Sequence, residues 1–170
     1  MFNLITILLG LVTTVFVGVG AALMNADLAI PSVPVIFVVY AALNRDAFGS
    51  LLTAFVLGIV AGIGLGEFRG VFLLSLLAAV AASRWARGRL PVSRRLGALS
   101  WVAVATILAN LSFVALGALL RPGLPFGRIL VLVSPRVALF NLLLAIPVFL
   151  VLGWIEPYLR ARQERTTLFN

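Results

Sequence analysis

Long apolar runs constrain this chain more than any other feature of its sequence. Hydrophobic residues make up 63% of its 170 residues and charged residues only 11%, whereas a soluble domain carries about 25% charged residues. A chain of this composition cannot cover itself with a polar surface. A helix rises about 1.5 Å per residue, so about 20 apolar residues cross the hydrocarbon core of a bilayer. We therefore predict an all-α integral membrane protein.

The apolar runs predict a six-helix transmembrane bundle that forms one polytopic domain over residues 1–170. The second run is short and has Pro31 and Pro34 near its start, which is typical of a helix that begins late, after an extended segment. This run either crosses the membrane as a thin or kinked span or is re-entrant. Residues 129–133 are too short to span and form an interfacial turn or an early extension of the last helix, in which Pro147 predicts a kink. The predicted spans are 4–24, 28–43, 47–65, 70–85, 96–120 and 137–155, followed by a polar tail at 156–170.

The arginine distribution predicts that both termini lie in the cytoplasm. With six spans, the segments on the side of the termini carry nine of the thirteen basic residues, all of them arginine, and the other side carries four. Cytoplasmic loops carry the excess of positive charge in membrane proteins. We therefore interpret the net charge of +8 as contact with anionic lipid rather than with nucleic acid. Aromatic residues also collect near the predicted inner boundary: Tyr40, Trp85, Trp101, Trp154 and Tyr158.

Gly58, Gly62, Gly66 and Gly70 recur at every fourth residue in and after the third run. On a helix, this spacing places the glycines in one nearly straight row without side chains. An interior glycine costs about 1 kcal/mol against alanine, but in a bilayer such a row allows another backbone to approach closely. We interpret the row as a helix-packing or partner interface.

The sequence offers little for catalysis. It has no histidine and no cysteine, and its five acidic residues lie at span ends, where we interpret them as solvated flanking charges. No acid pair within one span, phosphate-binding loop or metal-ligand spacing is present, so we predict no enzyme activity, no cofactor and no metal site. The polar residues within the spans are predicted to bond between helices, with a small-molecule pocket as the alternative. They are Thr13, Thr14, Asn110, Ser112 and Asn141, with Arg136 near the outer edge.

Three local stretches carry a resemblance to a known membrane family. They are Ala-Leu-Asn-Arg-Asp at 42–46, followed by a helix with Leu-Gly at 57–58; Leu-Gly-Glu-Phe-Arg-Gly-Val at 65–71; and Arg-Val-Ala-Leu-Phe-Asn at 136–141, followed by Ala-Ile-Pro at 145–147. They resemble the MreD family, the small membrane subunit of the bacterial rod-shape machinery. The first stretch resembles that family's second-to-third span hairpin, and the second resembles its glycine-marked third-to-fourth turn. The third resembles its last span, where an asparagine precedes a proline.

The resemblance implies a non-catalytic scaffold of the cell-wall elongation complex in the bacterial inner membrane. Besides membrane lipid, it implies binding to a bitopic MreC-like protein and, through it, to a penicillin-binding protein and a RodA-type glycosyltransferase that maintain rod shape. The family is also similar in fold to the substrate-binding subunits of energy-coupling-factor transporters, so vitamin capture is the alternative function. The residues predicted for helix packing or a partner interface are Gly58, Gly62, Gly66, Gly70, Asn110, Arg136, Asn141 and Pro147.

Overall fold

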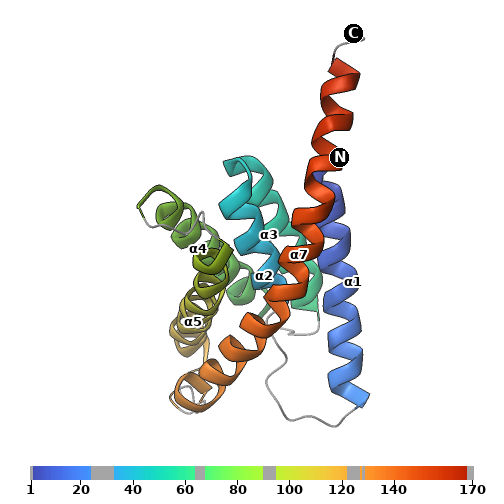
Figure 1. Cartoon of the computed structure of the whole chain (residues 1–170). Helices are drawn as coiled ribbons and strands as arrows, with labels where there is room; N and C mark the ends of the chain where they lie inside the picture. The colour runs from blue at the N-terminus through green and yellow to red at the C-terminus, as the bar shows by residue number, and fades with distance from the viewer. Residues whose placement is uncertain are drawn as a thin grey trace.

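The computed structural model of the protein describes residues 2–23, 33–63, 68–89, 95–121, 127 and 129–167. Within these ranges the chain forms six α-helices and one π-helical turn, so the all-α prediction is confirmed (Figure 1). The elements in chain order are α1 (Phe2–Leu23), α2 (Val33–Asn44), α3 (Ala47–Gly62), α4 (Arg69–Arg89), α5 (Arg95–Leu120), η2 (Ile129–Val133) and α7 (Ser134–Thr167).

Three of the described helices are long and apolar enough to cross a membrane. They comprise Arg69–Arg89, Gly97–Leu120 and Leu130–Pro157, the last of which joins η2 to α7. The other apolar helical stretches are shorter, at Leu4–Val17, Val33–Asn44 and Ala47–Gly62. The three long helices are typical of a membrane protein, and the complete six-span topology stays a prediction.

Helices α4 and α7 extend beyond the predicted spans. Helix α4 continues to Arg89 rather than ending at 85, because arginine is a good helix former and interacts favourably with the negative end of the helix dipole. Helix α7 continues through the charged tail to Thr167. Pro135 lies in its first turn, where proline is tolerated. The turn η2 runs directly into α7, so residues 129–133 are an early extension of the last helix.

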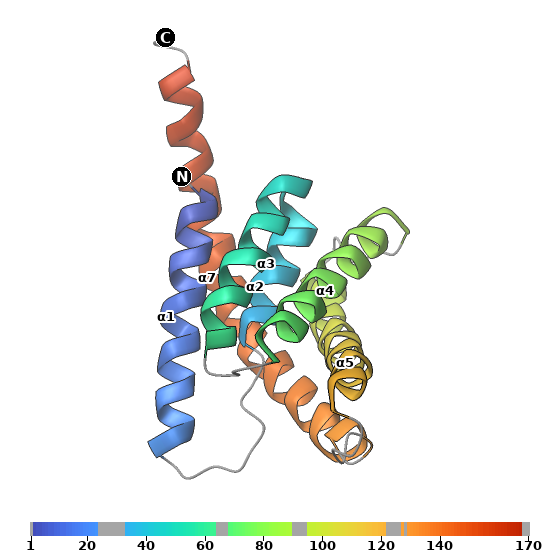
Figure 2. The same cartoon turned by 180° about the vertical axis from the view of Figure 1, so that it is seen from behind.

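Pro147 and Pro157 both lie inside α7, and the helix continues through both of them. Proline removes one backbone hydrogen bond and its ring pushes against the preceding turn, so helices bend at such positions. Figures 1 and 2 show α7 changing direction along its length, with its C-terminal part projecting beyond the other helices.

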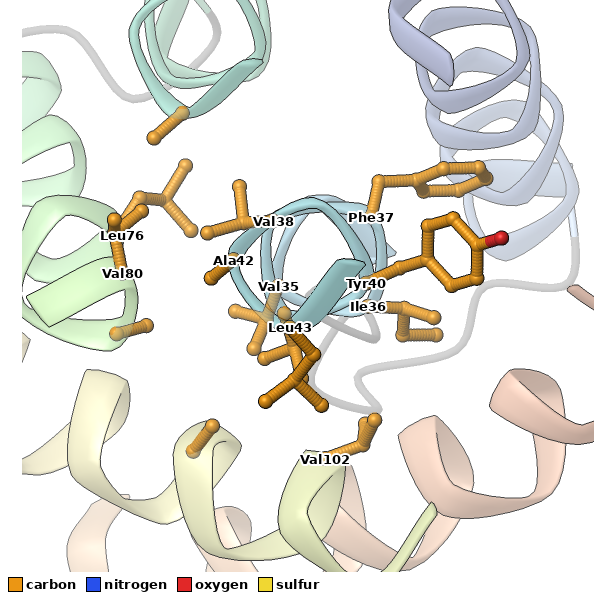
Figure 3. Close-up of a cluster of buried hydrophobic side chains, with 14 of the residues drawn as sticks. Val35, Ile36, Phe37, Val38, Tyr40, Ala42, Leu43, Leu76, Val80 and Val102 are labelled. Atoms are coloured by element: carbon orange, nitrogen blue, oxygen red, sulfur yellow. The ribbon is translucent and has the colours of Figure 1, made fainter. Parts of the chain in front are cut away.

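Helix α2 lies at the centre of the bundle. All its residues from Val33 to Leu43 are buried, and the helix contacts α1, α3, α4, α5 and α7. Figure 3 shows its side chains pointing outward toward the surrounding helices, including Val38 and Ala42 on the side of Leu76 and Val80. A helix that is apolar on all sides is expected in such a buried position.

The structure describes the second helix, α2, from Val33, and the predicted late start falls on residues outside those that the structure describes. Its 12 residues are about 18 Å long at about 1.5 Å per residue, which is shorter than the hydrocarbon core of a bilayer. Pro31 lies outside the described residues, as does the rest of the segment from 24 to 32.

The helices alternate in direction along the bundle. Figure 1 shows the N-terminus, the turn between α2 and α3, the C-terminal end of α4 and the C-terminus on the same side of the molecule. Consecutive helices of the bundle therefore run antiparallel to one another.

Cysteine labelling tests the predicted orientation. The native chain has no cysteine, and a Cβ atom at Gly88 or Gly127 meets no other atom within 4 Å. We expect Gly127→Cys to react with a membrane-impermeant maleimide in intact cells. Gly88→Cys should react only after the membrane is opened, because the arginine excess predicts that the C-terminal end of α4 lies in the cytoplasm. The reverse labelling pattern contradicts the orientation.

Candidate functional site

An ion pair and a hydrogen bond join α2 and α7 at the end of the bundle where α2 ends. The hydroxyl of Tyr40 donates to Oε2 of Glu156 at 2.8 Å, and Nη2 of Arg45 lies 3.3 Å from Oε1 of the same carboxylate. The side chains of Arg45 and Glu156 are each only 15% exposed. The prediction that the acidic residues are solvated flanking charges is therefore wrong for Glu156, whose carboxylate is held by both partners.

The turn after α2 is also bound to α4. The carbonyl oxygen of Arg45 accepts hydrogen bonds from Nη1 of Arg87 at 2.6 Å and Nη1 of Arg84 at 3.3 Å. Carbonyl groups at a helix C-terminus carry partial negative charge, so arginine side chains stabilise them. Asp46 caps the next helix, because its Oδ1 accepts from the backbone N–H of Gly49 at 3.2 Å.

A cavity of about 630 Å³ lies beside this cluster, between the C-terminal ends of α2 and α4, the first turns of α5 and the middle of α7. Its polar border includes Asn44, Arg87 and Glu156, and its apolar border includes Phe149 and Leu99. The rings of Tyr40 and Phe149 pack edge to face with their centroids 5.2 Å apart, so the wall between α2 and α7 is well packed.

The glycine row divides into positions with different surroundings. A Cβ atom at Gly58 would lie 2.6 Å from Cδ1 and 3.3 Å from Cα of Leu73, and one at Gly62 would lie 3.4 Å from Cα of Arg69. Both glycines therefore allow close contact between α3 and α4 of the same chain. A Cβ atom at Gly70 meets nothing within 4 Å, and Gly66 lies outside the described residues.

Asn141 joins α7 to α5 within the bundle. Its side chain is fully buried, and Nδ2 donates to Oγ1 of Thr106 at 3.0 Å. The Thr106 hydroxyl donates in turn to the carbonyl of Val102 at 2.8 Å. Asn110 is half-buried one turn further along α5. A second buried bond, from Nε1 of Trp101 to Oγ of Ser83 at 2.9 Å, joins α5 to α4.

Other hydroxyl groups bond within their own helices. Thr13 donates to the carbonyl of Leu9 at 2.7 Å, and Thr14 donates to that of Gly10 at 2.6 Å. Ser112 donates to its own helix in the same way, at 2.9 Å. These three residues therefore make an i−4 bond of the kind that satisfies hydroxyl groups in apolar surroundings.

The predicted site residues do not form one site. Gly58 and Gly62 lie at the contact between α3 and α4, Asn141 lies between α5 and α7, and Arg136 and Pro147 are exposed on α7. Sequence reasoning missed the cluster around Glu156. A usable signal was present, because Arg45 and Glu156 carry opposite charges at the same predicted membrane boundary. The members of this cluster are Tyr40, Arg45, Arg84, Arg87 and Glu156.

The fold and this polar cluster define a helical membrane protein whose helices are bonded to one another near one end. Among the described residues, no group of three or more histidine, cysteine or acidic side chains could hold a metal ion. No protein-family model, curated protein or solved structure matches the chain.

Proposed function

We propose that this protein is a non-catalytic membrane scaffold of the bacterial cell-wall elongation complex, as its resemblance to the MreD family implies. In this role it binds a bitopic MreC-like protein in the inner membrane. Through that partner it is associated with a penicillin-binding protein and a RodA-type glycosyltransferase.

The observation that carries the proposal is the use of buried polar groups for contacts between helices. The bonds from Asn141 to Thr106, from Trp101 to Ser83 and from Tyr40 to Glu156 connect α5 with α7, α5 with α4, and α2 with α7. Interhelical bonds of this kind hold membrane helices in fixed positions. A bundle held in this way suits a protein that presents a constant surface to its partners.

The apolar outer faces provide the area that such contacts need. Phe48 and Phe55 of α3, and Ile63 directly after the helix, are 72%, 51% and 63% exposed. Apolar side chains on the outside of a membrane bundle pack against either lipid or the helices of a partner. The exposed face of α3 is thus available to a single-span partner protein.

The cavity favours the alternative function, vitamin capture by a subunit similar to those of energy-coupling-factor transporters. Its volume of about 630 Å³ lies within the range of small-molecule sites, roughly 300–1,000 Å³. Such transporter subunits, however, take their substrate from the outer side. The predicted orientation places this cavity on the cytoplasmic side, so the scaffold function is the better supported of the two.

Purification and depletion separate these two functions. We expect the gently purified protein to carry a stoichiometric MreC-like protein and no vitamin by native mass spectrometry. We also expect depletion of the protein to turn rod-shaped cells round, because the elongation complex loses its scaffold. A stoichiometric vitamin adduct, together with unchanged cell shape on depletion, would falsify the scaffold function and favour vitamin capture.

A further inference from the structure

The cavity at the end of α2 combines one arginine, Arg87, with an apolar wall, and no part of the proposed scaffold function uses it. We propose that it binds an anionic phospholipid, with the phosphate at Arg87 and Asn44 and one acyl chain along the apolar side of α7. The inference is independent of the scaffold function. It rests on the charge, the shape and the position of the cavity.

The charged groups around the cavity include more arginines than acids. Arg87 and Glu156 border the cavity, and Arg45, Arg84 and Asp46 lie in the polar cluster beside it. Both carboxylate oxygens of Glu156 already contact protein groups, Tyr40 and Arg45, so this acid is neutralised within the protein. Asp46 is used as the cap of α3.

Arg87 is the residue best placed to bind the phosphate. Its side chain is exposed at the edge of the cavity, and one of its groups, Nη1, donates to the carbonyl of Arg45. A guanidinium has five N–H donors in a planar fork that suits phosphate oxygens. The amide of Asn44 is also exposed at this border, and its Nδ2 donates to the carbonyl of Tyr40.

The apolar wall suits an acyl chain. Ile146, Leu150 and Gly153 follow one another along α7 at helical spacing and border the cavity, with Leu99 of α5 on another part of its wall. Ile146 and Leu150 are 43% and 58% exposed, so this wall continues onto the outer surface of the bundle. Gly153 leaves room at the C-terminal end of this row of α7 residues, since a Cβ atom there meets nothing within 4 Å.

The position of the cavity matches the membrane surface. Trp154 borders the cavity and is 71% exposed, and tryptophan is enriched where acyl chains meet headgroups. Basic pockets between membrane helices at this level bind anionic headgroups. A helix from a protein partner fits less well, because it would cover Arg87 without supplying a phosphate.

Two variants test the site in the full-length protein. Gly153→Leu adds a side chain at the border of the cavity, where a Cβ atom meets nothing within 4 Å. Gly70→Leu is its matched control, because a Cβ atom at Gly70 also meets nothing within 4 Å. Arg87→Gln removes the charge, and Arg121→Gln removes an exposed charge at the opposite end. Melting of each variant without added lipid shows whether it is folded. If Arg87→Gln does not fold, the lipid retention of Gly153→Leu alone tests the site.

The probes are phosphatidylglycerol, phosphatidylcholine with the same acyl chains, and inorganic phosphate, measured by native mass spectrometry in mild detergent. We expect one retained phosphatidylglycerol, weaker retention of phosphatidylcholine and no effect of inorganic phosphate. Gly153→Leu should abolish retention, and Arg87→Gln should weaken it about fivefold, as expected for one basic residue near a membrane surface. The control variants Gly70→Leu and Arg121→Gln should retain phosphatidylglycerol as the native protein does.

Three outcomes overturn the proposal. The first is equal retention of the two lipids, or retention that neither Gly153→Leu nor Arg87→Gln reduces. The second is binding of inorganic phosphate as tight as that of the lipid, which would assign the cavity to a soluble phosphate compound. The third is a polypeptide retained in place of lipid and lost on Gly153→Leu, which would assign the cavity to a protein partner.

Discussion

Gly58→Leu is expected to lower the melting temperature of the purified protein by several degrees. A Cβ atom at this position would lie 2.6 Å from Cδ1 and 3.3 Å from Cα of Leu73. The Cδ1 atom can rotate away, but the Cα atom belongs to the backbone of α4, so α3 and α4 must separate. Overpacking of this kind costs about 1–3 kcal/mol, and 1 kcal/mol corresponds to about 2–4 °C in a chain of this size.

Gly70→Leu is the matched control for this prediction, because a Cβ atom at Gly70 meets nothing within 4 Å. It should leave the melting temperature nearly unchanged. Gly58→Ala should fall between the two, since it adds only the Cβ atom. The measurement is thermal unfolding in detergent, followed by tryptophan fluorescence. If Gly58→Leu and Gly70→Leu melt at the same temperature, α3 and α4 do not pack as closely at Gly58 as the structure shows.

Glu156→Ala is expected to destabilise the protein by about 1–3 kcal/mol, because it removes the acceptor of the buried Tyr40 hydroxyl and the ion-pair partner of Arg45. The Tyr40 hydroxyl lies 2.8 Å from Oε2, and Nη2 of Arg45 lies 3.3 Å from Oε1. With both charged side chains only 15% exposed, water compensates the loss only in part. The same thermal unfolding experiment measures the effect.

The conservative variant Glu156→Gln separates the two contacts. Glutamine keeps a carbonyl oxygen for the Tyr40 hydroxyl but removes the charge that faces Arg45, so it should destabilise the protein less than alanine does. A double-mutant cycle with Arg45→Ala should give effects that are not additive, as expected for residues in direct contact. Additive effects, or an unchanged melting temperature for Glu156→Ala, would show that the pair does not join α2 to α7.

Local hydropathy and turn chemistry were sufficient to predict the helical class and the position of each helix. Helix α5 begins at Arg95 against a predicted 96, and α3 begins at Ala47 as predicted. Pro31 and Pro34 predicted that the second helix starts late, because proline limits the backbone of the residues around it. Each of these predictions depends only on residues near one another in the chain.

Which helix lies at the centre was decided by the tertiary structure alone. The second apolar run is short, so its sequence suits a thin or re-entrant segment, yet α2 is the helix that the others surround. A helix that is apolar on all sides has no single face to show which neighbours it will contact. The central position therefore depends on how the other helices pack.

The polar cluster and the cavity also depend on tertiary structure. Tyr40 and Glu156 are 116 residues apart in the chain, and they meet because the C-terminal end of α2 lies against α7. Likewise, regular spacing predicted Gly58 and Gly70 in one row, but α3 ends at Gly62 and Gly70 lies in the first turn of α4, where a Cβ atom meets nothing within 4 Å. The sequence by itself determined which segments are helical and where polar groups interrupt them. The rotation and pairing of the helices determined which of those groups meet, because contacts between distant segments leave no local pattern.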